Sequence, residues 1–210
     1  MCGIVAIFSH RRRVSADLLG KAVEQLRPRG PDDTGVWIDP TGRAGLGHAR
    51  LSIIDAANGA QPMANEDGSM RLIVNGEFYD FERIREDLEK LGHTFSTLSD
   101  SEIALHLFEQ YGSDCLEHLR GEFAFSIWDS SKGELFAARD RFGIKPLFYA
   151  VDADNIYLAS EVKAIFAAGF RPAWDHRSVF QHLYFSVDQD RSLFHGVRQV
   201  PPGHFLRISD

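Results

Sequence analysis

The sequence predicts an α+β fold in which antiparallel β-hairpins are interspersed with amphipathic helices. Phe123, Phe125 and Ile127 alternate with Ala124, Ser126 and Trp128, and a turn at residues 130–133 leads into a second run at residues 135–139. A similar pair of runs, residues 147–150 and 156–160, is joined by a short polar turn. Strands connected in this way pair antiparallel, so separate layers of sheet and helix are expected.

The N-terminal segment is predicted to be a strand followed by a helix. Residues 3–8 form a nearly continuous apolar run rich in β-branched side chains, which indicates a buried strand. Ser15 is expected to cap the helix, and Pro28 and Gly30-Pro31 to end it. The apolar face of this helix comprises Leu18, Leu19, Ala22, Val23 and Leu26. Further strands are expected at residues 34–38, 45–53 and 70–75.

A second helix is expected to begin with Asp80 as its cap and to stop at Gly92. Its apolar stripe comprises Ile84, Leu88 and Leu91. Later in the chain, helices are expected near Glu161 and Asp175, and a closing strand at residues 203–208. No internal repeat, low-complexity tract or linker is visible, so residues 1–210 are predicted to form one domain.

A third helix is predicted from a capping-box pattern. Ser99 is followed three residues later by Glu102, which is the spacing at which the two residues satisfy each other's backbone N–H groups. Asp100 would then lie in the first turn, and the helix would end near Gly112. Cys115 follows in a short helical segment and is expected to be a small packed hydrophobe.

Composition excludes several classes of function. With 210 residues and 44% hydrophobic content, the chain can bury a substantial core. A net charge of -7 disfavours a nucleic-acid partner, because binding phosphates needs a concentrated basic face. No apolar stretch approaches the length of a membrane span and two cysteines build no disulfide framework, so a cytoplasmic protein without a membrane partner is expected.

Cys2 is the first candidate catalytic residue. Removal of Met1 would leave a cysteine that carries both a thiol and a free α-amino group. A terminal amine with a pKa of about 7.7–8.0 can accept the proton of a thiol with a pKa of about 8.5. One residue would then supply both the nucleophile and its base, whereas a cysteine at position 2 taken alone is more often an ordinary residue.

Metal and nucleotide sites are not expected from spacing along the chain. The nine histidines lack paired spacing and cysteine partners, so no metal site is predicted. The glycine-rich segment at residues 42–47 matches neither a dinucleotide fingerprint nor a phosphate loop and is typical of a tight turn.

Several unusual short segments recur in order along the chain. They are Arg27-Pro28-Arg29-Gly30-Pro31-Asp32, His48-Ala49-Arg50-Leu51-Ser52-Ile53, Val74-Asn75-Gly76-Glu77, Ser99-Asp100-Ser101-Glu102 and Arg139-Asp140-Arg141-Phe142-Gly143-Ile144-Lys145-Pro146-Leu147. Together with Met1-Cys2-Gly3-Ile4, these segments resemble the class II glutamine amidotransferases, and within them the glutaminase domain of glutamine-hydrolysing asparagine synthetases. The segments around Pro31 and Leu51 differ from those of amidotransferases of sugar-phosphate and purine synthesis, which supports the narrower resemblance.

The resemblance implies a fold and a set of site residues. The fold is the four-layer αββα sandwich of N-terminal nucleophile hydrolases, with two antiparallel sheets. Cys2 would attack the side-chain amide of L-glutamine and form a thioester, and Asn75 and Gly76 would stabilise the oxyanion. The residues implied to bind glutamine are Arg50, Leu51, Ser52, Ile53, Ile54, Asn75, Gly76, Glu77 and Asp100. Among them, Arg50 would bind the α-carboxylate and Asp100 the α-ammonium, with assistance from Glu77.

The resemblance also implies partners. The glutaminase domain itself would need no cofactor or metal, whereas a C-terminal synthetase domain, absent from this sequence, would use ATP and Mg to amidate aspartate. Ammonia would pass between the two active sites. The segments around Arg139 and Ser160-Glu161 also match the family and are expected to be structural or to face the partner domain. A homodimer is left open.

Two alternatives remain at this point. The same glutaminase module can serve another amide acceptor, as in asparagine-synthetase-like amidotransferases. A folded domain without catalytic activity can also contribute only contacts to a partner, but the joint presence of Cys2, Arg50, Asn75, Gly76 and Asp100 argues against this reading.

Overall fold

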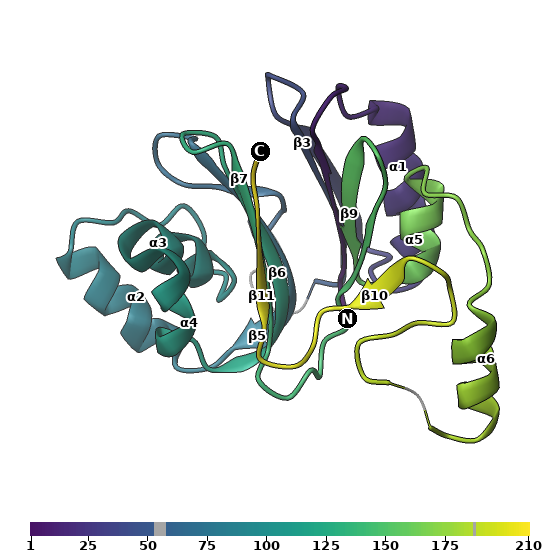
Figure 1. Ribbon diagram of the computed structural model, residues 1–210. Coiled ribbons are helices and arrows are strands. Elements are labelled where there is room, and N and C mark those ends of the chain that lie inside the picture. The colour runs from purple at the N-terminus through teal and green to yellow at the C-terminus, as the bar shows by residue number, and fades with distance from the viewer. Residues whose placement is uncertain (53–57, 187) are drawn as a thin grey trace.

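Two antiparallel sheets lie face to face between layers of helices (Figure 1). The computed structural model describes residues 1–52, 58–186 and 188–210. Sheet A has the strand order β10 (Val197–Gln199), β8 (Phe148–Val151), β9 (Asn155–Ala159), β1 (Gly3–Ser9), β3 (Ala44–Arg50) and β2 (Asp33–Ile38). Sheet B has the order β11 (Phe205–Ile208), β7 (Glu134–Arg139), β6 (Gly121–Asp129), β5 (Met70–Phe78) and β4 (Met63–Ala64).

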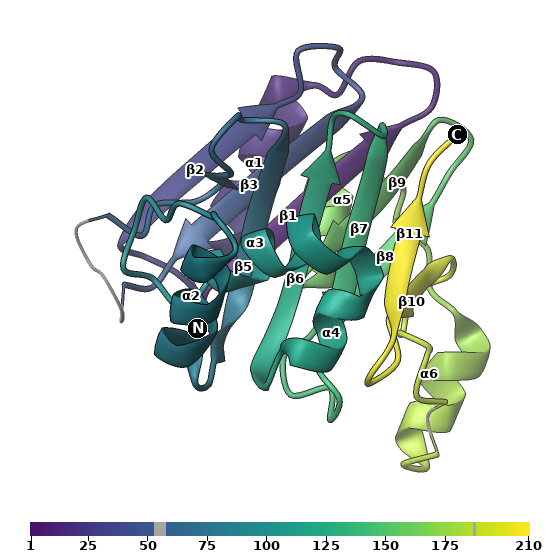
Figure 2. The same cartoon turned by 90° about the vertical axis from the view of Figure 1, so that its left-hand side faces the viewer.

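Each sheet has its own helical layer. The outer face of sheet A is covered by α1 (Ala16–Leu26) and α5 (Val162–Ala167), while α6 (His176–Leu183) lies to one side. The outer face of sheet B is covered by α2 (Phe81–Lys90), α3 (Glu102–Tyr111) and α4 (Cys115–His118), with the 3₁₀ turn Gly112–Asp114 between the last two. Figure 2 views the molecule from this side, with these helices in front of the strands of sheet B. The αββα sandwich expected from the resemblance is confirmed.

The two-residue period of a strand distributes β1 between two cores. Val5 and Ile7 pack against α1 and α5, whereas Ile4, Ala6 and Phe8 face sheet B. Strand β5 divides in the same way, since Ile73 joins the core between the sheets while its neighbours Leu72 and Val74 pack beneath α2 and α3. All residues of β1 are therefore buried, as the continuous apolar run predicts.

Most predicted elements are confirmed within one to three residues of their expected ends. Ser15 caps α1 by accepting a hydrogen bond from the Leu18 N–H at 3.4 Å. Both predicted hairpins form, as β6–β7 and β8–β9. The short strands β4 and β10 were not predicted, because two or three residues carry too little periodicity to be seen in a sequence.

Two details of the helices were predicted wrongly. Asp80 is the N-cap of α2 as predicted, although it has a left-handed conformation with φ of 57° and makes no side-chain capping bond, but Leu91 of the predicted apolar stripe is 55% exposed. The capping box does not form either. Helix α3 begins at Glu102 after an N-cap at Ser101, so Asp100 lies ahead of the first turn. The Glu102 carboxylate instead accepts hydrogen bonds from the backbone N–H groups of Ser96 and Thr97, at 2.7 and 2.8 Å.

Strand β3 also ends earlier than predicted, at Arg50 rather than at residue 53, and residues 51 and 52 are irregular. Among the helices of the described residues, none is long and apolar enough to cross a bilayer.

Candidate active site

A pocket opens where the N-terminus, the end of β3 and the middle of β5 meet. The pairing of β1 with β3 sets Gly3 opposite Ala49, so Cys2, just before β1, and Arg50, the last residue of β3, lie next to each other at one end of these two neighbouring strands. Asn75 and Gly76 reach the same pocket from sheet B, and Asp100 reaches it from the segment before α3. The predicted site residues that line the pocket are Cys2, Arg50, Leu51, Asn75, Gly76, Glu77 and Asp100.

The Cys2 sulfur is held by the chain just beyond β3. The backbone N–H of Leu51 donates to Cys2 Sγ at 3.4 Å, and the thiol lies 3.7 Å from the Leu51 carbonyl oxygen. Met1 precedes Cys2 in the structure, so the Cys2 nitrogen is a peptide nitrogen until Met1 is removed.

The backbone around Cys2 is fixed by two segments whose role the sequence left open. Arg29 Nε donates to the Cys2 carbonyl oxygen at 2.8 Å, and Arg29 Nη1 pairs with Glu161 Oε1 at 3.1 Å. Ser160 Oγ accepts the Ile4 N–H at 3.1 Å, while the Ser160 N–H donates to the Ile4 carbonyl at 2.9 Å. These segments therefore hold the start of β1, on which the position of the sulfur depends.

Asn75 is the most unusual polar residue of the pocket. Its side chain is fully buried, yet neither the amide nitrogen nor the amide oxygen has a hydrogen-bond partner among the described residues. Burial of an amide without partners is costly, so such a group points to a ligand that completes its hydrogen bonds. Asn75 and Gly76 lie inside β5 and not in a hairpin turn, which removes the ordinary structural explanation of an Asn-Gly pair.

Gly76 is required by packing as well. A Cβ atom at this position would meet the Glu122 carbonyl oxygen at 2.4 Å and Phe123 Cα at 2.7 Å, because β6 runs directly beside it. The glycine therefore permits the strand pairing that places its N–H, which adds to the sequence-based reason that the N–H must be approachable.

Arg50 and Asp100 supply opposite charges to one pocket. Both are buried, with 7% and 4% of their surface exposed. Asp100 Oδ2 accepts the Phe78 N–H at 2.8 Å, and the Ser99 hydroxyl lies 3.4 Å from Oδ1. Burial raises the pKa of Asp100 and the nearby Glu77 carboxylate adds to the shift, while the hydrogen bonds from Phe78 and Ser101 oppose it. A cationic group bound here would favour the ionised carboxylate.

Three residues predicted to line the pocket are not among those that the structure places there. Ser52 is absent from the described lining of the pocket, and its N–H donates instead to Asp32 Oδ2 at 2.8 Å. Ile53 and Ile54 lie outside the described residues.

Lys145 lines the pocket but was not predicted to do so. The Asp140 carboxylate accepts the N–H groups of Phe142, Ile144 and Lys145 at 2.9–3.0 Å and so shapes the loop that carries this lysine. Lys145 Nζ lies 2.9 Å from Glu122 Oε2. The segment had been singled out in the sequence, but only its folding shows that it reaches the pocket. Gln61 and Ser101 are further lining residues that the sequence analysis missed.

Comparison with known proteins places these residues in context. A family model described as a glutamine amidotransferase domain matches residues 1–210. A protein of Gibberella zeae named amidase chry2 is 41% identical over 98% of this chain and 32% of its own length. Asparagine synthetase (glutamine-hydrolyzing) 1 of Bacillus subtilis is 39% identical over 99% of this chain and 33% of its own length. The chain thus spans about a third of the length of these curated relatives.

Two solved structures share the fold. One is the structure of an allosteric regulatory enzyme of purine biosynthesis, with a TM-score of 0.73 and 24% identity over all of this chain and 47% of that chain. The other is glutamine phosphoribosylpyrophosphate amidotransferase of B. subtilis with ADP and GMP, with a TM-score of 0.71 and 22% identity over the same fractions.

Proposed function

The chain belongs to the glutamine amidotransferase domain family, and from this premise we propose that it hydrolyses L-glutamine to glutamate and ammonia through a thioester on Cys2. The observation that carries the proposal is the single pocket in which the Cys2 sulfur, the unpaired Asn75 amide, Arg50 and Asp100 meet.

The first step needs the amine that removal of Met1 releases. This α-amino group accepts the thiol proton as Sγ attacks the δ-carbon of the glutamine side chain. The C–N bond of the resulting tetrahedral intermediate then breaks, and the same amine returns the proton to the departing ammonia. A water molecule hydrolyses the thioester, which yields glutamate and restores the thiol.

Each tetrahedral intermediate carries a negative oxygen that needs fixed hydrogen-bond donors. The Asn75 Nδ2 and the Gly76 N–H supply them in this proposal, since both residues belong to β5 and are held there by pairing with β6. Donors that are already in place cost little reorganisation when the charge develops.

The two charged ends of glutamine are expected to set its orientation. The Arg50 guanidinium suits the α-carboxylate, because two parallel N–H groups match two oxygens. The Asp100 carboxylate suits the α-ammonium, with Glu77 nearby on β5. The proposed reaction uses only these groups and water, so we assign no cofactor to it.

Labelling of the nucleophile tests the glutaminase proposal. Intact-protein mass would be measured before and after treatment with a diazo-ketone analogue of glutamine. We expect loss of Met1 and one adduct, which excess glutamine prevents and Cys2→Ala abolishes.

Cys115→Ala is the matched control. Burial raises the pKa of the Cys115 thiol to about 12, so this residue should stay unreactive and its removal should leave the adduct unchanged. Processed, folded protein that binds glutamine but neither reacts nor turns it over would contradict the proposal and favour a domain without catalytic activity.

The amide acceptor is a separate proposal. Relatives named asparagine synthetase favour amidation of aspartate by a further ATP- and Mg-dependent domain of a longer protein. The fungal relatives named amidase, at 40–41% identity, favour the alternative of another acceptor. Incubation of the full-length protein with labelled glutamine, ATP, Mg²⁺ and aspartate decides between them: labelled asparagine supports the first, and ammonia without asparagine supports the second.

A further inference from the structure

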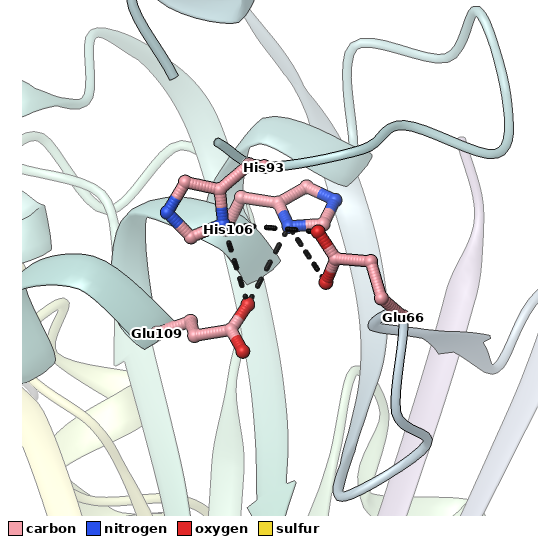
Figure 3. Close-up of side chains that lie close together, drawn as sticks. All are labelled: Glu66, His93, His106 and Glu109. Atoms are coloured by element: carbon pink, nitrogen blue, oxygen red, sulfur yellow. Dashed lines mark ion pairs between the residues drawn. The ribbon is translucent and has the colours of Figure 1, made fainter. Parts of the chain in front are cut away.

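A group of two histidines and two glutamates lies in the helical layer outside sheet B. His106 and Glu109 are one turn apart on α3, His93 follows α2, and Glu66 lies in the turn between β4 and β5. Their facing atoms all lie within 4.8 Å of one another. Figure 3 shows both rings and both carboxylates turned towards a common point.

The histidine nitrogens that face the group are both Nδ1. His93 Nδ1 lies 3.5 Å from Glu109 Oε2 and 4.0 Å from Glu66 Oε1. His106 Nδ1 lies 3.6 Å from Glu109 Oε2 and 3.7 Å from Glu66 Oε2. These separations are longer than hydrogen bonds between nitrogen and oxygen, so the four groups face one another without closing a bond.

Each of the opposite ring nitrogens faces a side-chain oxygen. His93 Nε2 lies 3.1 Å from Gln110 Oε1, and an amide oxygen only accepts, so Nε2 is the donor of this bond and Nδ1 is the nitrogen left to face the group. His106 Nε2 faces Glu102 Oε1 at 3.5 Å. This carboxylate, held by Ser96 and Thr97, likewise favours a proton on Nε2. A carboxylate or amide behind a histidine that presents its other nitrogen is the usual outer arrangement of a metal ligand.

The two carboxylates are held in a similar manner. Glu109 Oε1 accepts from Asn65 Nδ2 at 3.0 Å, which leaves Oε2 for the group. Glu66 Oε1 accepts the Thr94 N–H at 2.7 Å, and Oε2 faces His106. The side chains are therefore positioned by neighbours from several elements and not by one another.

The burial of His106 is a second reason, independent of the clustering, to expect a bound cation. Its side chain is fully buried, and Nδ1 has no hydrogen-bond partner among the described residues, while Nε2 lies 3.5 Å from Glu102 Oε1. A buried imidazole with an unpaired nitrogen is costly, and a charged imidazolium in the same place is costly as well. A cation coordinated by Nδ1 would remove the first cost without requiring the second.

We propose that Glu66, His93, His106 and Glu109 form a structural site for one Zn²⁺ ion. Ligands at about 2.0–2.2 Å around a tetrahedral zinc lie about 3.3–3.6 Å apart. The histidine Nδ1 atoms lie 3.5–3.7 Å from Glu109 Oε2 and Glu66 Oε2, and all the ligand atoms lie within 4.8 Å of one another, so shifts of about 1 Å or less would close the site. Imidazole and carboxylate ligands suit this ion, and four protein ligands close its coordination. Glu66 and Glu109 are about one-third exposed, which gives the ion access from solvent.

This inference goes beyond the sequence-based expectation that no metal is bound, which considered spacing along the chain alone. The ion would tie α3 to the β4–β5 turn and to the segment after α2. Because Ser99, Asp100 and Ser101 directly precede α3 and line the active-site pocket, the site would also stiffen one wall of that pocket.

Zinc binding would be measured in full-length protein carrying Cys2→Ala, so that the active-site thiol cannot bind the metal. We expect one Zn²⁺ per chain by elemental analysis and chelator competition, and a Tm that rises by several degrees with zinc. Replacement of zinc by Co²⁺ should give the visible absorption of a tetrahedral nitrogen and oxygen site.

His93→Gln and Glu109→Gln test the ligands, because neither residue belongs to a hydrophobic core cluster and their replacement need not disturb the core. Each should weaken zinc binding at least about tenfold. Glu82→Gln, on the exposed face of α2, is the matched control and should leave it unchanged.

Two results would overturn the inference. One is zinc affinity that stays unchanged in both ligand variants. The other is an absence of zinc-dependent stabilisation in folded protein, with the variants shifting Tm equally in zinc and in chelator. The second result would identify the group as an ion-pair network of protonated histidines.

Discussion

Asn75 would serve the proposed reaction at a cost in stability. Its amide is buried within β5 without hydrogen-bond partners among the described residues. Its presence is explained by the proposed oxyanion, which would supply the acceptor that the folded chain lacks.

Asn75→Ala should therefore separate activity from stability. Loss of one oxyanion donor typically lowers kcat by about 10²–10³-fold, whereas KM for glutamine should change little. The free energy of unfolding should fall by no more than about 1 kcal/mol, because the lost packing is offset by removal of an unpaired amide. Glutamate release and urea unfolding measure the two effects, and a kcat within about threefold of wild type would contradict the assignment.

The lowered pKa of His48 leads us to expect a free energy of unfolding that depends on pH. Burial lowers the pKa of this histidine from 6.5 to about 4, although its hydrogen bond to the Val74 carbonyl at 3.0 Å partly opposes the shift. Above pH 6.5 neither the folded nor the unfolded chain protonates His48. Between pH 6.5 and 4 only the unfolded chain does, so stability falls as pH falls through this window.

The expected loss from His48 between pH 7 and pH 5 is about 2 kcal/mol. Urea unfolding at the two pH values measures the total change, to which other groups contribute. His48→Gln removes the titrating group, so its loss over the same interval should be smaller by about this amount. Equal pH dependence in both proteins would show that His48 is not the cause.

At the scale of elements, Gly30 shows how the turn after α1 fixes the position of the end of β3. A Cβ atom on Gly30 would meet the Ala49 carbonyl oxygen at 2.2 Å and the Arg50 carbonyl carbon at 2.6 Å. The turn after α1 therefore packs against the end of β3, which carries Arg50 into the pocket.

Gly30→Ala should consequently raise KM for glutamine and lower stability, because the end of β3 must move. Gly20→Ala is a matched control within α1, where a Cβ atom meets nothing within 4 Å. This change should leave the kinetics unchanged and stabilise the protein by up to about 1 kcal/mol, since alanine favours the helix. Steady-state kinetics and thermal unfolding of the two variants provide the check, and similar behaviour of both would refute the packing argument.

At the scale of the whole molecule, buried hydrogen bonds join the two sheets within an apolar interface, and the bond between Trp128 and Asp39 is one of them, beside that of His48 with Val74. Trp128 Nε1, on β6, donates to Asp39 Oδ1 at 3.1 Å, and Asp39 follows β2 of the other sheet. Both side chains are almost fully buried. Asp39 Oδ2 also accepts the Thr41 N–H at 3.0 Å, so the carboxylate is shared between a local turn and the opposite sheet.

Trp128→Phe should cost about 1–3 kcal/mol or more, because it leaves part of a buried carboxylate without a donor and removes ring volume from the core. Asp39→Asn retains an acceptor for the indole and should cost less. Urea unfolding followed by circular dichroism compares the two variants. A smaller loss in Trp128→Phe than in Asp39→Asn would contradict this account of the bond.

Local rules explain which parts of the fold could be predicted. The position of β1, the Ser15 cap of α1 and the β6–β7 hairpin depend on neighbours within a few residues, and all three were predicted. The capping box at Ser99 failed because Glu102 bonds to Ser96 and Thr97 instead, and local spacing does not show which of these partners the carboxylate takes.

The same distinction between local and tertiary determinants applies to the candidate site. The sequence by itself determined which residues are chemically able to act, since Cys2, Arg50, Asn75 and Asp100 stand in recognisable segments. Only the tertiary structure decided that they share one pocket, that Ser52 lies outside its described lining and that Lys145 belongs to it. The group around His106 was invisible in the sequence for the same reason. Such contacts join segments far apart in the chain, and sheet register and core packing, not local conformational preference, bring them together.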